Sequence, residues 1–236
     1  MEHRDSRSWV RAAWALLAKV DELKPRQVLV QRESWWGRPG WIGLLRIEDC
    51  VTAISPTSEL VEPLIRALTD LSPSDALSPD CIIPRLPTIV EILGPARLYY
   101  PGEHLAVATA DTPVDAVPPA NVSSLLAGVT QDELDESGLA EVTSSVSIVR
   151  GKQGEPIAGC GYRHWPGQVA HLSVLTRTGY RGKGLARAVA IDASTRALAE
   201  GLLPQWRART APSQSVALAV GFEQLGAQLS LRPSSA

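Results

Sequence analysis

The stretch that decides the fold spans residues 174–186 and reads Val-Leu-Thr-Arg-Thr-Gly-Tyr-Arg-Gly-Lys-Gly-Leu-Ala. Its first three residues end an apolar run that predicts a strand, and residues 183–200 are rich in Ala and Leu, which favours a helix. Gly182 and Gly184 remove the Cβ atoms that would block close approach to the backbone. Because the first amides of a helix have no intrahelical acceptor and lie at the positive end of its dipole, this turn predicts a site for an oxyanion, in particular a diphosphate.

The distribution of charge along the chain supports an anion at this turn. Residues 98–149 contain no Lys or Arg and are strongly acidic, whereas residues 156–191 contain no Asp or Glu. The second tract holds five cations: Arg163, Arg177, Arg181, Lys183 and Arg187. The turn matches neither GxxxxGK[ST] nor GxGxxG, so it is not a nucleotide-binding loop of those two kinds.

The segment from Tyr180 to Ala186 resembles the R/Q-x-x-G-x-G/A motif of the GNAT (N-acetyltransferase) superfamily, with Ala186 in the final small position. Residues 174–176 resemble the end of that family's splayed fourth strand, and residues 217–222 resemble its last helix and turn. The order of predicted elements from Leu105 onward is also similar.

The resemblance implies acetyl-CoA, or another acyl-CoA, as the donor. The pyrophosphate would be held at the turn that begins with Arg181. It would bind the backbone amides of Gly182, Lys183, Gly184, Leu185 and Ala186. The backbone of Val174 and Thr176 would pair with the pantetheine arm like an added strand. Leu175 would neighbour the thioester, where a backbone amide could polarise the carbonyl.

The sequence departs from the family pattern at the residues that move protons. Gln168 stands near the place where many members have a Glu base, so His171 in the predicted fourth strand is our first candidate for the base and His164 is the second. Thr210 and Ala217 take the positions of the family's Asn and of the Tyr that acts as its acid. Ser213 falls where a subgroup has Ser, and its hydroxyl could cap the helix or touch CoA.

These features predict an N-acetyltransferase in which a bound small-molecule or peptide amine attacks the thioester directly, within a ternary complex. The alternative is a catalytically weak CoA-binding sensor or regulatory module. A protein that keeps the fold without the cofactor is a third class. The predicted helices after the first strand of the C-terminal half carry five carboxylates that would favour a cationic amine: Asp132, Glu133, Asp135, Glu136 and Glu141.

The predicted fold class is α/β, with a GNAT-like mixed central sheet flanked by helices. The expected division is an N-terminal α/β accessory region at residues 1–100 and a GNAT-like acetyltransferase domain at residues 101–236. The accessory region is either a degenerate GNAT-like half or a unit that covers the cleft or mediates a homodimer. Residues 72–101 are rich in Pro and receive no assignment, and Leu105–Thr109 is predicted as the first strand of the second domain.

Composition bounds the remaining choices. With 44% hydrophobic and 20% charged residues and a net charge of −2, the chain is typical of a globular protein without the basic field that holds nucleic acid. The three cysteines, Cys50, Cys81 and Cys160, form no CxxC pair, so we expect neither a metal site nor a disulfide framework. The absence of an apolar leader or a membrane-length run predicts no membrane association and a cytoplasmic protein.

Overall fold

The computed structural model describes residues 6–30, 37–107 and 112–234. The chain forms two compact units, residues 1–98 with 224–236 and residues 99–223. Two long strands, β4 (Ile89–Pro101) and β10 (Phe222–Pro233), each contribute to both units. The division of the chain into domains at residue 100 stays a prediction.

The first unit is built on a small mixed sheet. Its strands β1 (Gln27–Val30), β3 (Cys50–Ser55), β2 (Ile42–Ile47) and β10 lie in that order, with β1 parallel to β3 and the other neighbours antiparallel. Helices α1 (Ser6–Leu17), α2 (Val61–Leu68) and α3 (Pro79–Ile82) complete it. Leu44, Leu64 and Leu229 are fully buried in a core that joins β2, α2 and β10.

The second unit contains the predicted strand, turn and helix. Its strands are β5 (Asp115–Val117), β6 (Val146–Arg150), β7 (Pro156–Trp165), β8 (Val169–Thr176) and β9 (Leu203–Ala208). They lie in the order β9-β8-β7-β6-β5, antiparallel except for β8 and β9, which are parallel. The predicted α/β class with a mixed central sheet is therefore confirmed.

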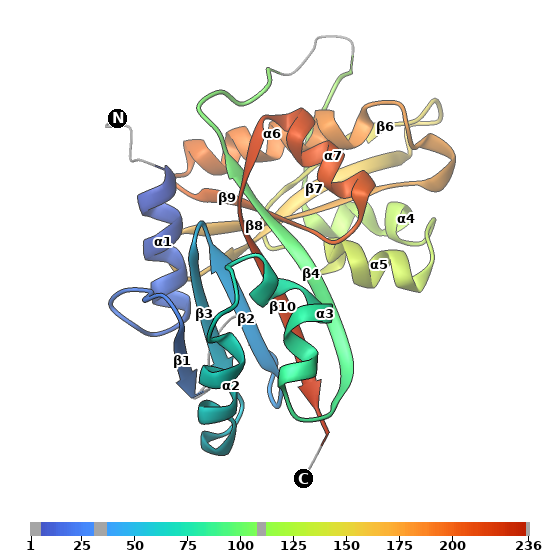
Figure 1. The fold of residues 1–236 in the computed structure, drawn as a ribbon. Coiled ribbons are helices and arrows are strands. Elements are labelled where there is room, and N and C mark those ends of the chain that lie inside the picture. Colours follow the sequence, from blue (N-terminus) through green and yellow to red (C-terminus); the bar gives the residue numbers. More distant parts are fainter. Residues whose placement is uncertain (1–5, 31–36, 108–111, 235–236) are drawn as a thin grey trace. The chain divides into compact units, whose positions relative to one another are not determined.

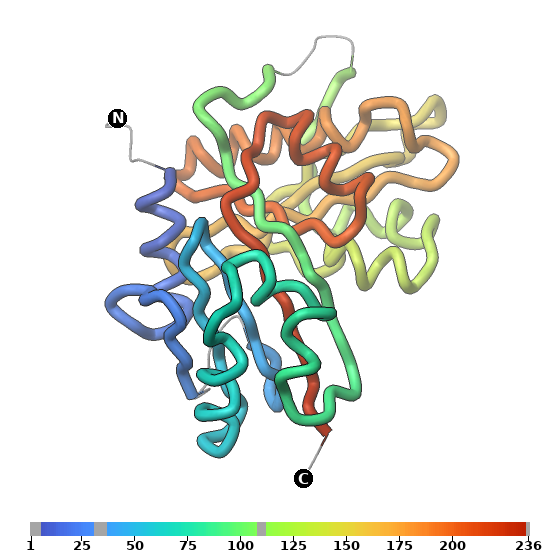
Figure 2. The backbone as a smooth tube through the Cα atoms, viewed as in Figure 1, coloured from blue at the N-terminus to red at the C-terminus, as the bar shows by residue number. Residues whose placement is uncertain are grey.

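Helices cover both faces of this sheet (Figure 1). Helices α6 (Leu185–Ala199) and α7 (Ala211–Val220) pack on the face that presents Cys160, Tyr162 and Leu172. Helices α4 (Ser123–Leu126) and α5 (Gln131–Ser137) belong to the opposite face, where Leu125 packs in one cluster with Ile148 and Leu175. Because successive side chains of a strand point to opposite faces of the sheet, residues two positions apart on one strand lie on the same face. Figure 2 traces the path from β8 through α6 into β9.

The strand β4 was not predicted, because its Gly94, Pro95 and Pro101 are residues that weaken a strand pattern. The predicted strand at Leu105–Thr109 is wrong for residues 105–107, and residues 108 and 109 lie outside the described residues. The amide of Ala106 instead donates to the carbonyl of Val220 at the end of α7. No helix in the described ranges combines the length and apolar character that crossing a bilayer requires.

Candidate active site

The glycine turn has the local conformation that its sequence predicts. Gly182 and Gly184 have φ angles of 75° and 77°, in the left-handed region that a residue with a Cβ rarely adopts. Gly184 is the N-cap of α6, a helix of 15 residues. A Cβ built on either glycine, or on Gly179, meets no atom within 4 Å, so open space lies beside the turn.

The amides of this turn are available to an anion. The first helical hydrogen bond joins the amide of Ala188 to the carbonyl of Gly184. Within the described residues, no backbone hydrogen bond uses the amides of residues 182–186. The hydroxyl oxygen of Thr176, at the end of β8, is buried and likewise has no hydrogen-bond partner there. These groups fit the predicted diphosphate cradle, because each offers a donor that the described protein leaves unused.

Strands β8 and β9 separate above this turn. They pair through Val169 with Leu203, Ala170 with Pro204 and His171 with Gln205, and the pairing ends there. Residues 172–176 of β8 and 206–208 of β9, all of them described, are therefore not paired with each other. The separation has its apex at His171 and its mouth at Thr176, roughly 17 Å away at the rise of an extended strand. The backbone edge of β8 at Val174 and Thr176 is therefore not paired with β9, as the resemblance implies.

The cations around the turn have protein partners. Arg181 forms an ion pair with Glu133 of α5, and its Nε donates to the carbonyl of Thr176 at 3.1 Å. Lys183 places its Nζ 5.2 Å from the ring centroid of Tyr180. Arg177 and Arg187 donate to the carbonyls of Ser124 and Ala219. Of these four cations, Arg181 and Lys183 belong to the turn itself.

His171 lies at the apex of the separated strands. Its Nδ1 is 2.9 Å from Oε1 of Gln205, whose Nε2 donates to the hydroxyl of Tyr100 at 2.8 Å. Its ring stacks on Trp165 with centroids 4.3 Å apart. Burial, followed by the positive charges of Arg207 and Arg163, lowers the pKa of His171 to about 3. The imidazole is therefore neutral at physiological pH.

His164 does not join His171. The β7–β8 register pairs His164 with Ala170, so its side chain lies on the other face of the sheet from His171. It is exposed and stacks against Tyr162, whose hydroxyl donates to Glu200 after α6. The two candidate bases thus serve different faces, and only His171 lies beside the apex.

Ser213 lies in the first turn of α7, beyond the end of β9. The helix is capped by Thr210, whose hydroxyl accepts a hydrogen bond from the Ser213 amide. The Ser213 hydroxyl does not cap the helix but accepts a hydrogen bond from Nε1 of Trp206 at 3.0 Å. Its own proton is directed away from that bond. Ala217 is fully buried in the α6–α7 core and offers no acid.

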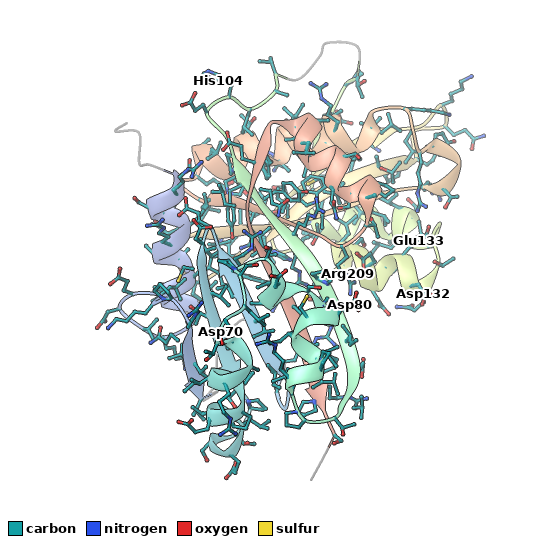
Figure 3. All side chains as sticks on the ribbon, in the orientation of Figure 1. Asp70, Asp80, His104, Asp132, Glu133 and Arg209 are labelled. Carbon is teal, nitrogen blue, oxygen red and sulfur yellow. The ribbon has the colours of Figure 1, made fainter. Side chains whose placement is uncertain are left out.

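The five acidic residues of the predicted wall are largely occupied. Three form ion pairs: Glu133 with Arg181, Glu136 with Arg209, and Glu141 with Arg163. Asp135 accepts a hydrogen bond from Gln131. Figure 3 labels Asp132, Glu133 and Arg209. Pairing with arginine cancels most of the attraction for a cationic amine that the acidic sequence predicts.

Sequence reasoning missed the groups that support the candidate residues. Gln205 is the one whose pattern could have been noticed, because it is a polar residue inside the buried strand Leu203–Ala208. Tyr100, Trp165 and Trp206 have no sequence signal for their roles, since each acts through a contact across the fold.

Comparison with known proteins agrees with this geometry. Residues 146–227 match the family model of GNAT acetyltransferases. The chain contains a GNAT acetyltransferase domain. The match includes β6, β7, β8, the glycine turn, α6, β9 and α7. The predicted placement of the GNAT domain in the C-terminal half is confirmed.

Solved structures share the GNAT fold at low sequence identity. A GCN5-related N-acetyltransferase-like protein from Streptococcus suis has a TM-score of 0.50 and 18% identity, over 82% of this chain and 84% of that chain. An acetyltransferase of the GNAT family from Colwellia psychrerythraea has a TM-score of 0.48 and 14% identity, over 62% of this chain. This chain covers 58% of the Colwellia protein. No curated protein matches the sequence at a significant level.

Proposed function

We propose that this chain is an acyl-CoA-dependent N-acyltransferase that transfers an acetyl group from acetyl-CoA to an amine. The observation that carries the proposal is the separation of β8 from β9 directly above a glycine turn with unused amides. A strand-like arm fits an open strand edge, and a diphosphate fits a helix N-terminus. The GNAT family match supports the same class of reaction.

In this proposal the donor is held by backbone groups. Gly182, Lys183, Gly184, Leu185 and Ala186 bind the diphosphate through their amides, and Arg181 and Lys183 add positive charge. The edge of β8 at Val174 and Thr176 binds the pantetheine arm. The side chain of Leu175 is buried in the α4–α5 core and its backbone pairs with Gly159 of β7, so we propose no direct contact between Leu175 and the thioester.

The acceptor amine attacks from the apex of the separated strands. His171 is our candidate for the residue that contacts the amine there. An imidazole whose pKa is near 3 is a very weak base, so it does not take a proton from an ammonium ion. Because the side-chain oxygen of Gln205 faces Nδ1 of His171, this nitrogen carries the proton. Nε2 of His171 then accepts a hydrogen bond from the neutral amine. His171 then orients the nucleophile. His164 stays a weaker candidate because it serves the other face.

The leaving thiolate needs a stabilising donor, and Ser213 is our candidate. Trp206 fixes the hydroxyl oxygen, which leaves the Ser213 O–H free to donate to developing negative charge at the N-terminus of α7. Attack forms the C–N bond and breaks the C–S bond. The amine's surplus proton passes to water.

The test is release of free thiol from acetyl-CoA in the presence of single amines, followed by a comparison with propionyl-CoA and longer acyl donors. Thiol release that depends on an amine, together with the acetylated amine identified by mass, supports the proposal. Saturable binding of CoA with no acyl transfer to any amine contradicts an enzyme.

That second result would select the alternative, a CoA-binding sensor or regulatory module. One observation favours it: Ala217, which aligns with the acid of many family members, is fully buried and contributes no proton donor.

A further inference from the structure

Five side chains from three strands gather on one face of the second unit, beside the apex. Arg163 is paired directly with His171 across β7 and β8, so both point to the same side. Trp165 lies two residues beyond Arg163 and stacks on the His171 ring. On β9, Gln205 bonds to His171, and Arg207 lies two residues further along the same face.

The local charge of this face is positive. His171 is neutral, and the two residues whose charges lower its pKa are the cations Arg207 and Arg163. Arg163 is held by Glu141 in an exposed ion pair with N–O distance 2.7 Å. The nearby carboxylates Glu133 and Glu136 are engaged by Arg181 and Arg209. A cationic tail on an acceptor would meet repulsion here, whereas an anionic group would be attracted.

Arginine side chains also have the geometry for such a group. The planar guanidinium donates two parallel hydrogen bonds to a carboxylate or a phosphate. Arg207 is exposed and lies at the point where β9 has separated from β8, two residues past the last paired position. Arg207 therefore lies on the same face as His171, beyond the last paired position of β8 and β9.

We propose that the acceptor is an amine that also carries an anionic group, a carboxylate or a phosphate, with Arg207 binding the anion while His171 orients the amine. This inference rests on the proposed transferase function and names its substrate class. The chemistry of transfer is unchanged: the amine nitrogen forms the amide bond, the C–S bond breaks so that the thiolate leaves, and the amine's surplus proton goes to water.

The test compares matched acceptors with the full chain and acetyl-CoA. The set consists of n-alkylamines, ω-amino carboxylates and aminoalkyl phosphates of equal chain length, assayed for kcat/KM at a pH where each amine is half neutral. We expect at least a tenfold preference for an anionic acceptor over the alkylamine. The carboxylate and phosphate arms distinguish the two sources of the anion.

Two variants separate this role from a structural one. Arg207→Gln is expected to raise KM for the anionic acceptor at least tenfold and to bring the preference over the alkylamine toward one. The control is Arg150→Gln, which removes an exposed arginine of β6 that pairs with Asp115 of β5. This variant is expected to keep the preference for the anionic acceptor. Rescue by Arg207→Lys would support a charge-based role.

Each outcome bears on a different claim. Equal kcat/KM for anionic and uncharged acceptors, or a preference that survives Arg207→Gln, overturns this inference. CoA binding with no binding or reaction of any anionic amine overturns it as well and leaves the donor site standing. Failure of the wild-type chain to bind CoA contradicts the proposed function itself.

Discussion

Glu133 of α5 forms an ion pair with Arg181, the first residue of the motif, across a sequence separation of 48 residues. Glu133 is also the N3 residue of the α5 capping box, since its carboxylate accepts a hydrogen bond from the amide of Thr130 at 2.9 Å. These contacts, with the Thr130 bond as the largest, lower the pKa of Glu133. The start of α5 is thereby tied to the turn proposed to bind the donor.

Removing this carboxylate charge is expected to strengthen donor binding. Glu133→Gln keeps an acceptor for the capping box and frees Arg181 from its counter-ion, so we expect CoA to bind about two- to fivefold more tightly at low salt, the scale of an exposed ion pair. Calorimetric titration at low and high salt measures the effect. The control is Glu136→Gln, which removes a carboxylate of the same helix that pairs with Arg209 instead of Arg181. Weaker binding by Glu133→Gln would mean that the pair positions Arg181 productively.

Loss of the Ser213 hydroxyl is expected to slow the transfer step. Ser213→Ala leaves the indole N–H of Trp206 without its acceptor and removes a donor to the leaving thiolate, so we expect kcat to fall about tenfold or more with little change in KM. Ser215→Ala is the matched control, because Ser215 lies on the same helix and, among the described residues, its hydroxyl donates to the carbonyl of Ala211 within that helix. Equal effects of the two substitutions would remove Ser213 from the mechanism.

The pH dependence of the rate follows from the neutral His171. Because its pKa is about 3, His171 does not titrate between pH 5 and 9. We expect kcat/KM to rise with pH toward the pKa of the acceptor amine, with a midpoint that moves when the amine is changed. A limb near pH 6.5 that is fixed across amines and lost in His171→Asn would show an ordinary, titrating base instead.

Stability is expected to depend on the same residue. The folded pKa of His171 lies below its ordinary value of 6.5, so the unfolded chain binds more protons between about pH 6.5 and pH 3. His171 therefore makes stability fall as the pH drops through that window, by up to about 1.4 kcal/mol per pH unit. The free energy of unfolding of His171→Asn, compared with wild type at pH 7 and pH 4.5, is expected to fall less on acidification.

The features of the fold that depend on local backbone conformation could be predicted from the sequence. Gly182 and Gly184 are glycines because their backbone needs a positive φ, and that requirement is visible in the motif. The mixed sheet was expected because the predicted strands are joined by both hairpin-length and helical connections. The strand β4 could not be predicted, because its pattern contains Pro95 and the pairing that stabilises it is long-range.

The candidate site was predictable only where it consists of backbone. The cradle at residues 182–186 needs amides and glycines, which the motif specifies. The bond between Trp206 and Ser213, the contact of Gln205 with Tyr100, and the pair of Glu133 with Arg181 join different elements. Such contacts depend on how helices pack on the sheet, so sequence spacing does not specify them. Capping α7 was one of the two roles open to Ser213, but Thr210 caps this helix.

The measurement that tests the central claim most directly is calorimetric titration of the wild-type chain and Gly184→Asp with CoA. Gly184→Asp places a carboxylate where the diphosphate is proposed to lie, at a backbone position with φ of 77°. Gly179→Ala, a neighbouring glycine with open space and no positive φ, controls for substitution in the turn. The account predicts saturable binding by wild type and Gly179→Ala, with binding by a folded Gly184→Asp weakened at least a hundredfold. Normal CoA binding by Gly184→Asp, or no binding by wild type at millimolar CoA, would contradict it.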